Sequence, residues 1–590
     1  MFESLITRQL QHYRKTTGDY RSVFSTEDRR RIRLANDRFH PRRRTIVFVV
    51  FENQYASVGG LGTIARHLPE HIARGNERVI VITPLHRNHP AVKAALAAQV
   101  FRTCFVNRSF ACANFTTTLS CYQDTTATVP SYYVEMPAQF VNADNPYEFE
   151  TPGGLVCDSL ALCAATPFAL ASLGITRDIV FHAHDWETAA VALTSKIALV
   201  SGLLENAVSI LTLHNSYDAP LPVNACNRFF GAPAAGATVL QASIPYLDGP
   251  ITTVSTPFAV ELQFDPLQTR HFAPHLQQFF AVNKPIGVEN GMFGKLHLPY
   301  SLQAVEAARS GSIQHLHYEK MAYKQAFVEA ATAYKDARIR GLLEFCGTLT
   351  EPLFFMTGRL DIMQKGFDVI FEAFRRLPRA SCKLFFCPSS AGSGENAVLD
   401  YFNDIAQECR GDITIWPFRL SADQYNMYLQ GSDYLLMPSL YEPFGAATEG
   451  YIHGTPVVAR ATGGLISQIN PVNKKDIQLP EFYRDMINHV WKEDKPTGFL
   501  YRETISGGNT GTSWRELIGT PVQKRMDSAL FQSMVAAATE TLIEACACRK
   551  LPERFCQLML NGFECVQTLT WQKAVDKYRS IYDSALVSHT

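Results

Sequence analysis

Excess charge and paired cysteines are missing from this 590-residue sequence, and no long apolar run is expected in it. The 55 Lys and Arg residues balance the 55 Asp and Glu residues, and a formal net charge of zero argues against nucleic acid as the main partner. The 14 cysteines form no CxxC pair and no repeated spacing. This pattern argues against a disulfide framework or the usual zinc site, and predicts free thiols in a reducing compartment.

Membrane and export signals are also missing from the sequence pattern. No apolar run is expected to reach the ~18 residues that a membrane span needs. The first residues, MFESLITRQLQHYRK, carry charge within their apolar part, unlike a signal peptide. The chain is therefore predicted to be cytoplasmic, and its length predicts two or more domains.

Residues 1–44 differ from the rest of the chain because they are strongly basic. They hold twelve Lys and Arg against five Asp and Glu. A solvated, partly helical extension would explain this composition. An arm that docks on a partner subunit or an anionic surface would explain it equally, and self-association is one form of such docking.

From residue 45 onward, apolar runs of strand length alternate with helical patterns. TIVFVVFEN (45–53) is followed by the turn SVGGLG, a helical stretch and the buried-strand run RVIVITP. A strand, turn, helix and second strand in this order predict a βαβ unit with parallel strands. The pattern recurs in both halves of the chain. The predicted fold class is α/β, with two doubly wound Rossmann-like domains facing a central cleft.

In such sheets ligands bind beyond the carboxyl ends of the strands, so the turns that follow strands carry the candidate sites. Gly59 and Gly60 lie in the first such turn, before a helix. Glycines let a backbone approach a ligand closely, and a helix N-terminus offers free N–H groups to an anion. It is not a Walker loop, because no Gly-Lys-Ser/Thr follows. A plain tight turn is the alternative.

The stretch FHAHDWETA also follows a predicted strand. Its two histidines, His182 and His184, would point to one face of that strand, and Asp185 comes directly after them. A metal site is one interpretation, but no third ligand set is evident nearby. We favour a polar cluster in which His184 hydrogen-bonds a substrate hydroxyl. A structural histidine remains the other alternative.

Two basic residues follow the first strand of the second half. Arg359 ends the strand in MTGRLDIMQKGFDVI, and Lys365 comes just before the next helix. A guanidinium binds phosphate through two donors and an ammonium supplies a point charge, so together they could neutralise a diphosphate without a metal. A solvated pair of loop residues is the alternative.

A pair of glutamates follows the next strand, in PSLYEPFGAATEGYIHGTPVVARATGGL. Pro443 stiffens the turn that carries Glu442, and Glu449 lies in the helix that follows. A carboxylate held beside a helix N-terminus, with Arg359 and Lys365 opposite, fits a site for sugar hydroxyls and a nucleotide diphosphate. Ordinary α/β loops are a poor explanation, because four motifs occur at strand ends in this order.

Taken in order, these motifs resemble those of the glycogen/starch synthase family of retaining glycosyltransferases, which has the GT-B fold of two Rossmann-like domains. The resemblance covers nearly all of residues 45–582. Further motifs follow in the family's order: LTLHN, TTVST, GVENG, HGTPVVARATGGL and PTGFLY. Each motif alone is modest evidence, whereas the ordered set is specific.

The resemblance implies catalytic and donor-binding roles. Gly59 and Gly60 would approach the donor's phosphates. Arg359 and Lys365 would bind the diphosphate and stabilise the leaving group, and Glu442 would hold the donor glucose.

Further roles are implied on both substrates. His184 would contact the transferred sugar near its 6-hydroxyl. It is predicted to be catalytic together with Glu442, Arg359 and Lys365. The backbone of Phe444, Gly445 and Ala446 would support sugar and phosphate, and Glu449 would bind ribose.

On the acceptor side, Asp158 and Asn215 are the candidates. The sequence departs from the family pattern at Ser57, where the family has a lysine before the two glycines, and at Thr63, where it has an acidic residue.

The resemblance also implies a domain division. A basic extension (1–44) precedes an acceptor-side domain (45–294) and a nucleotide-sugar-binding domain (295–565), and a C-terminal helix (566–590) crosses back to the first domain. The apolar residues of LTWQKAVDKYRSIYDSAL fall mostly on one face at helical spacing, so this helix must be buried against a core. Packing within the C-terminal domain alone is the alternative.

The implied activity is that of a retaining hexosyltransferase, glycogen synthase-like, that needs no metal or other cofactor. It would move glucose from ADP-glucose or UDP-glucose to the 4-hydroxyl of an α-1,4-glucan. Two alternatives stay open. One is a transferase of the same fold that acts on a small acceptor. The other is a weakly active homologue that serves as a scaffold or regulatory subunit.

Overall fold

The computed structural model divides into two compact units. Unit 1 comprises Met1–Val254, Phe272–Phe293 and Trp571–Thr590, and unit 2 comprises Ser255–His271 and Gly294–Thr570. The structure describes residues 24–75, 77–142, 145–149, 153–231, 238–292, 298–389, 395–504 and 511–587.

The described part of unit 1 is built on a nine-stranded sheet in the order β3-β4-β5-β2-β1-β6-β7-β8-β9. All neighbours from β5 to β9 are parallel. The strands are β1 (Thr45–Val49), β2 (Arg78–Pro84), β3 (Phe101–Cys112), β4 (Phe115–Asp124), β5 (Ser131–Glu135), β6 (Ile179–His184), β7 (Ala207–Leu213), β8 (Ile251–Thr253) and β9 (Ile286–Gly287).

The central strands are buried on both faces, as parallel strands covered by helices must be. All five residues of β1 and all six of β6 are buried. In register, Val49 of β1 pairs with Ala183 of β6, and His184 of β6 pairs with Thr212 of β7. The carboxyl ends of these three strands therefore lie side by side, which gathers the turns that follow them.

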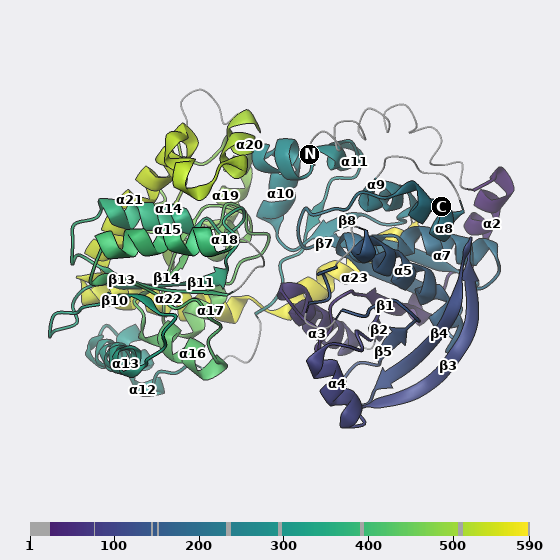
Figure 1. Ribbon diagram of the computed structural model, residues 1–590, viewed down its shortest axis with the longest axis horizontal. Coiled ribbons are helices and arrows are strands. Elements are labelled where there is room, and N and C mark those ends of the chain that lie inside the picture. Colours follow the sequence, from purple (N-terminus) through teal and green to yellow (C-terminus); the bar gives the residue numbers. More distant parts are fainter. Residues whose placement is uncertain are drawn as a thin grey trace. The chain divides into compact units, whose positions relative to one another are not determined.

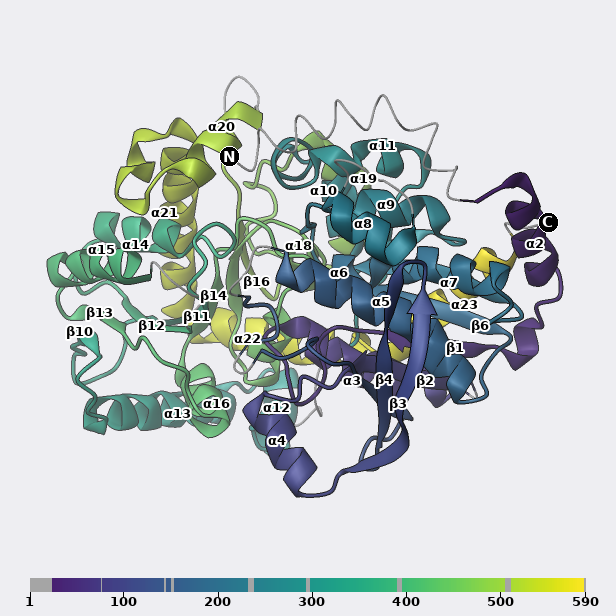
Figure 2. The same cartoon turned by 45° about the vertical axis from the view of Figure 1, so that its right-hand side comes forward.

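At one edge the sheet departs from the expected doubly wound pattern. Strands β3 and β4 form a long antiparallel hairpin, which Figure 2 shows as two curved strands, and β4 pairs antiparallel with β5. Ala113 adopts a positive φ of 50° in the two-residue turn that joins β3 to β4. A two-residue turn of this kind matches the twist of antiparallel strands.

Three helices of unit 1 bear on the site and the core. Helix α3 follows β1, helix α6 follows β6, and helix α23 is the last helix of the chain. The described helices are α2 (Thr26–Asn36), α3 (Gly60–Ala73), α4 (Pro90–Ala97), α5 (Gly154–Ser172), α6 (Asp185–Ala189), α7 (Val191–Val200), α8 (Val223–Phe230), α9 (Val239–Ser243), α11 (Gln277–Val282) and α23 (Trp571–Val587).

Helix α5 corrects the expectation about apolar runs. It spans 19 residues and is long and apolar enough to cross a membrane by length and composition, and it is the one described helix that passes this test. Asp158 is its single charged residue. Most of its apolar window, 72%, is buried inside the protein, as in the core helix of a globular unit.

The basic extension is described only from residue 24, and residues 1–23 lie outside the described residues. Helix α2 begins after Ser25, whose hydroxyl accepts from the backbone N–H of Asp28 while the Asp28 carboxylate accepts from the backbone N–H of Ser25. This reciprocal cap stabilises the first turn. The arginines Arg29, Arg30, Arg31 and Arg33 are exposed.

Helix α23 packs into the core of unit 1. Trp571, Val575 and Tyr578 are at most 6% exposed and belong to one apolar cluster with residues of β1, β2 and α3. The indole N–H of Trp571 donates to the carbonyl oxygen of Met292 at 2.8 Å. The chain thus returns to unit 1 after it has built unit 2.

The described part of unit 2 holds a seven-stranded sheet in the order β10-β13-β12-β11-β14-β15-β16. Only the edge strand β10 is antiparallel to its neighbour. The strands are β10 (Arg340–Leu343), β11 (Leu353–Arg359), β12 (Lys383–Ser389), β13 (Asp412–Ile415), β14 (Tyr434–Met437), β15 (Val457–Arg460) and β16 (Gly498–Tyr501).

Helices cover both faces of this sheet, with α14 and α15 on one face and α13 and α16 on the other (Figure 1). The described helices of unit 2 are α10 (Thr256–Phe264), α12 (Leu302–Arg309), α13 (Gln314–Ala333), α14 (Phe367–Arg376), α15 (Glu395–Glu408), α16 (Ala422–Gly431), α17 (Ala447–Ile452), α18 (Gly464–Gln468), α19 (Arg484–Val490), α20 (Gly511–Gly519), α21 (Ala529–Arg549) and α22 (Pro552–Thr568).

Residues 255–271 belong to unit 2, although the sequence placed them within the domain 45–294. The buried carboxylate of Glu261 accepts from the hydroxyl of Thr462 at 2.8 Å and from the backbone N–H of Gly463 at 2.7 Å. Arg502 also pairs with Asp265 at 2.8 Å. These long-range polar contacts attach α10 to unit 2. The local sequence pattern does not predict them.

Candidate functional site

Two of the predicted residues meet directly in unit 2. The ammonium of Lys365 donates to Oε2 of Glu442 at 2.6 Å, and the hydroxyl of Ser439 donates to the same oxygen at 2.7 Å. The side chains of Lys365 and Glu442 are 20% and 12% exposed, so the pair is shielded but accessible. Lys365 lies in the turn after β11 and Glu442 in the turn after β14, which are neighbouring strands.

Three glycines allow this close approach of turns. A Cβ on Gly366 would come within 2.4 Å of the carbonyl oxygen of Pro438. A Cβ on Gly463 or Gly464 would come within 2 Å of the carbonyl oxygens of Glu442 or Phe444. Gly366 and Gly463 also have φ values of 58° and 47°, which favour glycine. The glycines of ATGGL therefore serve to pack one turn against the backbone that carries Glu442.

Arg359 is the last residue of β11, as the sequence predicted for a strand end. Its guanidinium donates to Oε1 of Gln364 at 3.1 Å. Gln364 is adjacent in sequence to Lys365, so this bond links the end of β11 to the turn that carries the second predicted phosphate-binding group.

The backbone after Glu442 is held by a buried glutamine. Nε2 of Gln468 donates to the carbonyl oxygens of Phe444 at 2.8 Å and Gly445 at 3.3 Å, and Oε1 accepts from Ala447 at 3.1 Å. Gly445 has a φ of 87°. Ala446 is the cap residue before α17.

Glu449 lies in α17 and has a hydrogen-bond partner of its own. The hydroxyl of Tyr425 donates to its carboxylate at 2.6 Å. Burial raises the pKa of the Glu449 carboxyl, and the bond from Tyr425 partly offsets this rise. Its contact with ribose stays a prediction.

The glycine turn of unit 1 holds a residue that the sequence did not single out. Oε2 of Glu52, just after β1, accepts from the backbone N–H groups of Val58 at 3.0 Å, Gly59 at 3.2 Å and Gly62 at 3.1 Å. The hydroxyl of Ser57 donates to the same oxygen at 3.0 Å. N–H groups expected to meet the donor's phosphates are thus bound by a carboxylate of the chain itself.

This carboxylate also stabilises the start of α3, since a negative charge is favourable at a helix N-terminus. The hydroxyl of Tyr147 donates to the other oxygen of Glu52 at 2.9 Å. The signal in the sequence was an acidic residue directly after a buried strand. Ser57, in the place of the family's lysine, donates a hydrogen bond to Glu52 in this structure.

The two histidines of β6 face the same side, as predicted. Their rings stack with centroids 4.3 Å apart. His182 is held by the hydroxyls of Tyr582 at 2.9 Å and Thr212 at 2.7 Å. Nδ1 of His184 lies 2.8 Å from Nε2 of His214, in the turn after β7. The sequence did not single out His214, although the motif LTLHN contains it.

The remaining polar residues of unit 1 bond mainly to one another and to backbone. Asp185 accepts from the backbone N–H of His214 at 2.6 Å and from Nδ2 of Asn215 at 3.3 Å, so it does not join the two histidine rings. Asp158 accepts from the backbone N–H of Phe140 at 2.7 Å and is 3% exposed. Burial raises the pKa of Asp158 and of Asp185 to about 7. Asn215 therefore bonds to the residue that follows His184, whereas Asp158 holds the backbone of the loop at Phe140.

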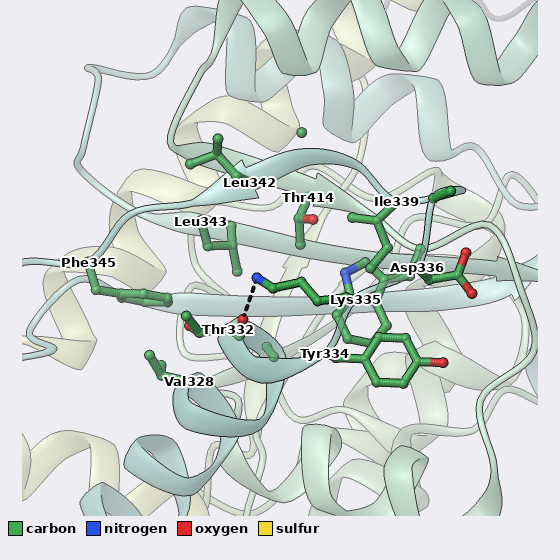
Figure 3. Close-up of a pocket in the computed structure, with 14 residues that line it drawn as sticks. Val328, Thr332, Tyr334, Lys335, Asp336, Ile339, Leu342, Leu343, Phe345 and Thr414 are labelled. Atoms are coloured by element: carbon green, nitrogen blue, oxygen red, sulfur yellow. Dashed lines mark hydrogen bonds between the residues drawn. The ribbon is translucent and has the colours of Figure 1, made fainter.

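Unit 2 also holds a cavity of about 590 Å³ (Figure 3). It is lined by the end of α13, by β10 and by Thr414 and Trp416 of β13 and its continuation. Within it, the ammonium of Lys335 donates to the carbonyl oxygen of Thr332 at 3.0 Å. None of the predicted site residues lines it.

Two family models match parts of this chain. Residues 45–277 match the model of the starch synthase catalytic domain, and residues 348–475 match that of glycosyl transferases group 1. The chain is a glycosyltransferase that resembles glycogen and starch synthases. The matched domains and the relatives named glycogen synthase identify it as a hexosyltransferase.

The relatives of this glycosyltransferase have low sequence identity to it, but their alignments cover most of each chain. Glycogen synthase of Pseudothermotoga lettingae is 25% identical over 438 residues, which cover 71% of this chain and 83% of that protein. The probable glycogen synthase of Methanocaldococcus jannaschii is 23% identical over 575 residues, covering 90% of this chain and 96% of that protein.

A solved structure confirms the predicted GT-B fold of the glycosyltransferase. The catalytic domain of starch synthase IV from Arabidopsis thaliana, bound to ADP and acarbose, superposes with a TM-score of 0.65. The two share 17% identity, and the alignment covers 92% of this chain and 99% of that one.

Proposed function

We propose that this glycosyltransferase moves glucose from ADP-glucose or UDP-glucose to the 4-hydroxyl of an α-1,4-glucan, with retention of configuration. The curated relatives that bear the name glycogen synthase support this proposal, although at 23–26% identity. A starch synthase of the same fold has been seen with ADP and acarbose, a nucleotide diphosphate and an oligosaccharide mimic.

The contact between Lys365 and Glu442 carries the proposal. In a nucleotide-diphosphate sugar, the anomeric carbon is bonded directly to a phosphate oxygen. A group that holds the sugar and a group that binds the diphosphate must therefore lie within a few ångströms of each other. Lys365 and Glu442 are in contact at 2.6 Å, and Arg359 ends the strand that leads into the turn with Lys365.

The chemistry required of these residues is mainly electrostatic. As the bond to the sugar breaks, negative charge develops on the leaving diphosphate. Fixed positive groups aimed at that charge stabilise the transition state without reorganisation. Arg359 and Lys365 provide two such groups, so the proposal needs no metal. Glu442 would bind sugar hydroxyls and leave Lys365 for the phosphate when the donor arrives.

One observation favours a second candidate function, a weakly active homologue that serves as a scaffold. Ser57 replaces the lysine that the family places before its glycines, and Glu52 occupies the N–H groups of that turn. The exposed arginines of α2 would then provide a docking surface for a partner or a second copy. The pairing of Lys365 with Glu442 favours the enzyme.

Release of nucleotide diphosphate tests the proposal. Purified full-length protein would be assayed with ADP-glucose and with UDP-glucose, each with and without glycogen. We expect release from one donor that depends on glycogen, with transfer of labelled glucose to the polymer. Release that depends on a small sugar instead of glycogen would identify a small-acceptor transferase. No release from either donor, in protein that still binds nucleotide, would favour the scaffold.

A further inference from the structure

The pair formed by His184 and His214 is a feature that the proposed function does not yet use. Nδ1 of His184 and Nε2 of His214 lie 2.8 Å apart, at the ends of neighbouring strands β6 and β7. Burial lowers the pKa of His214 to about 3 and lowers the pKa of His184 well below its ordinary value. Both rings are therefore neutral, and each carries one N–H group and one lone pair.

A hydrogen bond between two neutral imidazoles can be arranged in two ways. If His214 donates from Nε2, then Nδ1 of His184 accepts and the N–H of His184 is at Nε2. If His184 donates instead, both rings must carry their proton on Nδ1. The first arrangement is the more favourable, because Nε2–H is the commoner tautomer of a neutral histidine side chain.

In the first arrangement, Nε2–H of His184 is a donor without an acceptor. Nε2 of His184 is buried, and it has no hydrogen-bond partner among the residues that the structure describes. The side chain of His184 exposes no surface. A buried donor without an acceptor costs about 1–3 kcal/mol, so an oxygen atom of a ligand that reached it would be bound favourably.

The neighbouring rings limit how His184 can turn. His182 stacks on it at 4.3 Å, and Phe48 stacks at 5.3 Å with the planes 19° apart. His182 is itself fixed by hydrogen bonds to Tyr582 of α23 and Thr212 of β7. With the ring plane set by stacking, the bond to His214 decides which nitrogen of His184 keeps its proton.

We propose that His214 is a positioning residue that holds His184 with its Nε2–H group ready to donate to an oxygen atom of the sugar substrate. This inference rests on the proposed function, in which His184 contacts the transferred sugar. His214 does not touch the substrate and acts only through His184. Because the His184 ring is buried, the atoms around it must move when that oxygen arrives.

A pair of matched variants tests this role. In His214→Gln, the side-chain Nε2 occupies nearly the position of the histidine Nε2 and can still donate to His184. In His214→Phe, the ring size is kept but both nitrogens are lost. Steady-state kinetics with the full-length enzyme would give kcat and KM for donor and glycogen. Selective ¹⁵N labelling of histidine would report the tautomer of His184, assigned with His184→Ala.

The expected outcome is a split between the two variants. His214→Phe should lower kcat by about 10–100-fold, the range that applies when a group orienting a metal-bound histidine through its other nitrogen is removed. His214→Gln should stay within about threefold of wild type, and the wild-type spectrum should show His184 with its proton on Nε2. Changes in KM should be smaller than those in kcat.

Two kinds of result would overturn the inference. One is a proton on Nδ1 of His184 in the wild-type protein. The other is equal loss of activity in folded Gln and Phe variants, which would mean that His214 acts by packing. Failure of the proposed function is recognised separately, because His184→Ala would then keep full turnover or no turnover would be found at all. The tautomer of His184 would still decide the inference in those cases.

Discussion

At the scale of single residues, the turns at strand ends are shaped by polar groups that satisfy one another before any substrate is bound. Lys365 is paired with Glu442, and Glu52 accepts from three backbone N–H groups. Preorganised charges and dipoles of this kind cost little to align during a reaction.

Removal of either positive charge near Glu442 should abolish most turnover. We expect Arg359→Ala and Lys365→Ala each to lower kcat by about 10²–10³-fold, because each removes a fixed charge that stabilises the leaving diphosphate. Thermal unfolding should change little, since Lys365 is 20% exposed and its ion pair is not deeply buried. Lys335→Ala, in the cavity that none of the predicted site residues lines, is a matched control. Near-normal turnover in both site variants would contradict the assignment.

The buried carboxyl of Asp158 should make stability depend on pH. Burial raises its pKa from 3.8 to about 7, so between these values the folded state holds a proton that the unfolded state has lost. Its contribution to stability therefore falls as the pH rises from about 4 to 7. Three pKa units correspond to at most about 4 kcal/mol.

Asp158→Asn removes this penalty while its amide oxygen can still accept from the backbone of Phe140. We expect the variant to be more stable than wild type at pH 8 and nearly equal to it at pH 4, as measured by denaturant unfolding at several pH values. Asp37→Asn, at an exposed position, should show no such trend. A variant that is less stable than wild type at pH 8 would show that the carboxylate is needed in its charged form.

At the scale of elements, α23 joins the end of the chain to the core of unit 1. Its apolar face packs on β1, β2 and α3, and its tyrosines reach His182 and Thr212. One helix therefore completes an apolar core and supports the histidines of β6.

Truncation of one large side chain on this helix should be costly. Trp571 is 6% exposed and bonds to Met292 through its indole N–H. We expect Trp571→Ala to lower the free energy of unfolding by about 3–5 kcal/mol, the usual cost of removing a buried aromatic side chain. Lys573→Ala, on the exposed face of the same helix, should change it by less than about 0.5 kcal/mol. Equal effects from the two changes, in chemical denaturation, would argue against this burial.

Removal of the whole helix tests its link to function. A chain that ends before Leu569 keeps Arg359, Lys365, Glu442 and His184 but loses the hydroxyls of Tyr578 and Tyr582. We expect this truncated chain to lose activity and to expose the apolar surface of unit 1, measured by turnover and by binding of a hydrophobic dye. Full activity with no increase in dye binding would show that α23 is dispensable.

At the scale of the whole molecule, the charge needed for catalysis is predicted to come from side chains alone. Among the described residues there is no group of three or more His, Cys, Asp or Glu placed to hold a metal ion. We expect chelator-treated enzyme to keep its turnover, because Arg359 and Lys365 supply the positive charge for the diphosphate. Loss of activity on chelation, restored by Mg²⁺ or Mn²⁺, would require a cation at the diphosphate.

Much of the architecture could be predicted because the signals for it are local. Buried strands read as short β-branched runs, and turns after them read as glycine-rich or polar stretches. Arg359 does end a strand, and the two histidines of β6 do share a face, since side chains alternate along a strand. The assignment of α10 to unit 2 was missed because the partners of Glu261, Thr462 and Gly463, lie far along the chain. The hairpin of β3 and β4 was missed although its pairing is local, because the turn Ala113-Asn114 lacks the Asn-Gly or Asp-Gly signature of such turns.

By itself, then, the sequence determined the alternation of strands and helices, hence two α/β units, and the polar residues at strand ends. Only the tertiary structure decided which of these residues meet. Lys365 and Glu442 are 77 positions apart, and they touch because β11 and β14 are neighbours in the sheet. Glu52 accepts from the glycine turn because the chain folds back after β1. His214 meets His184 because β6 and β7 are neighbouring strands. Strand order is set by the packing of the whole core, and no local stretch of sequence contains it.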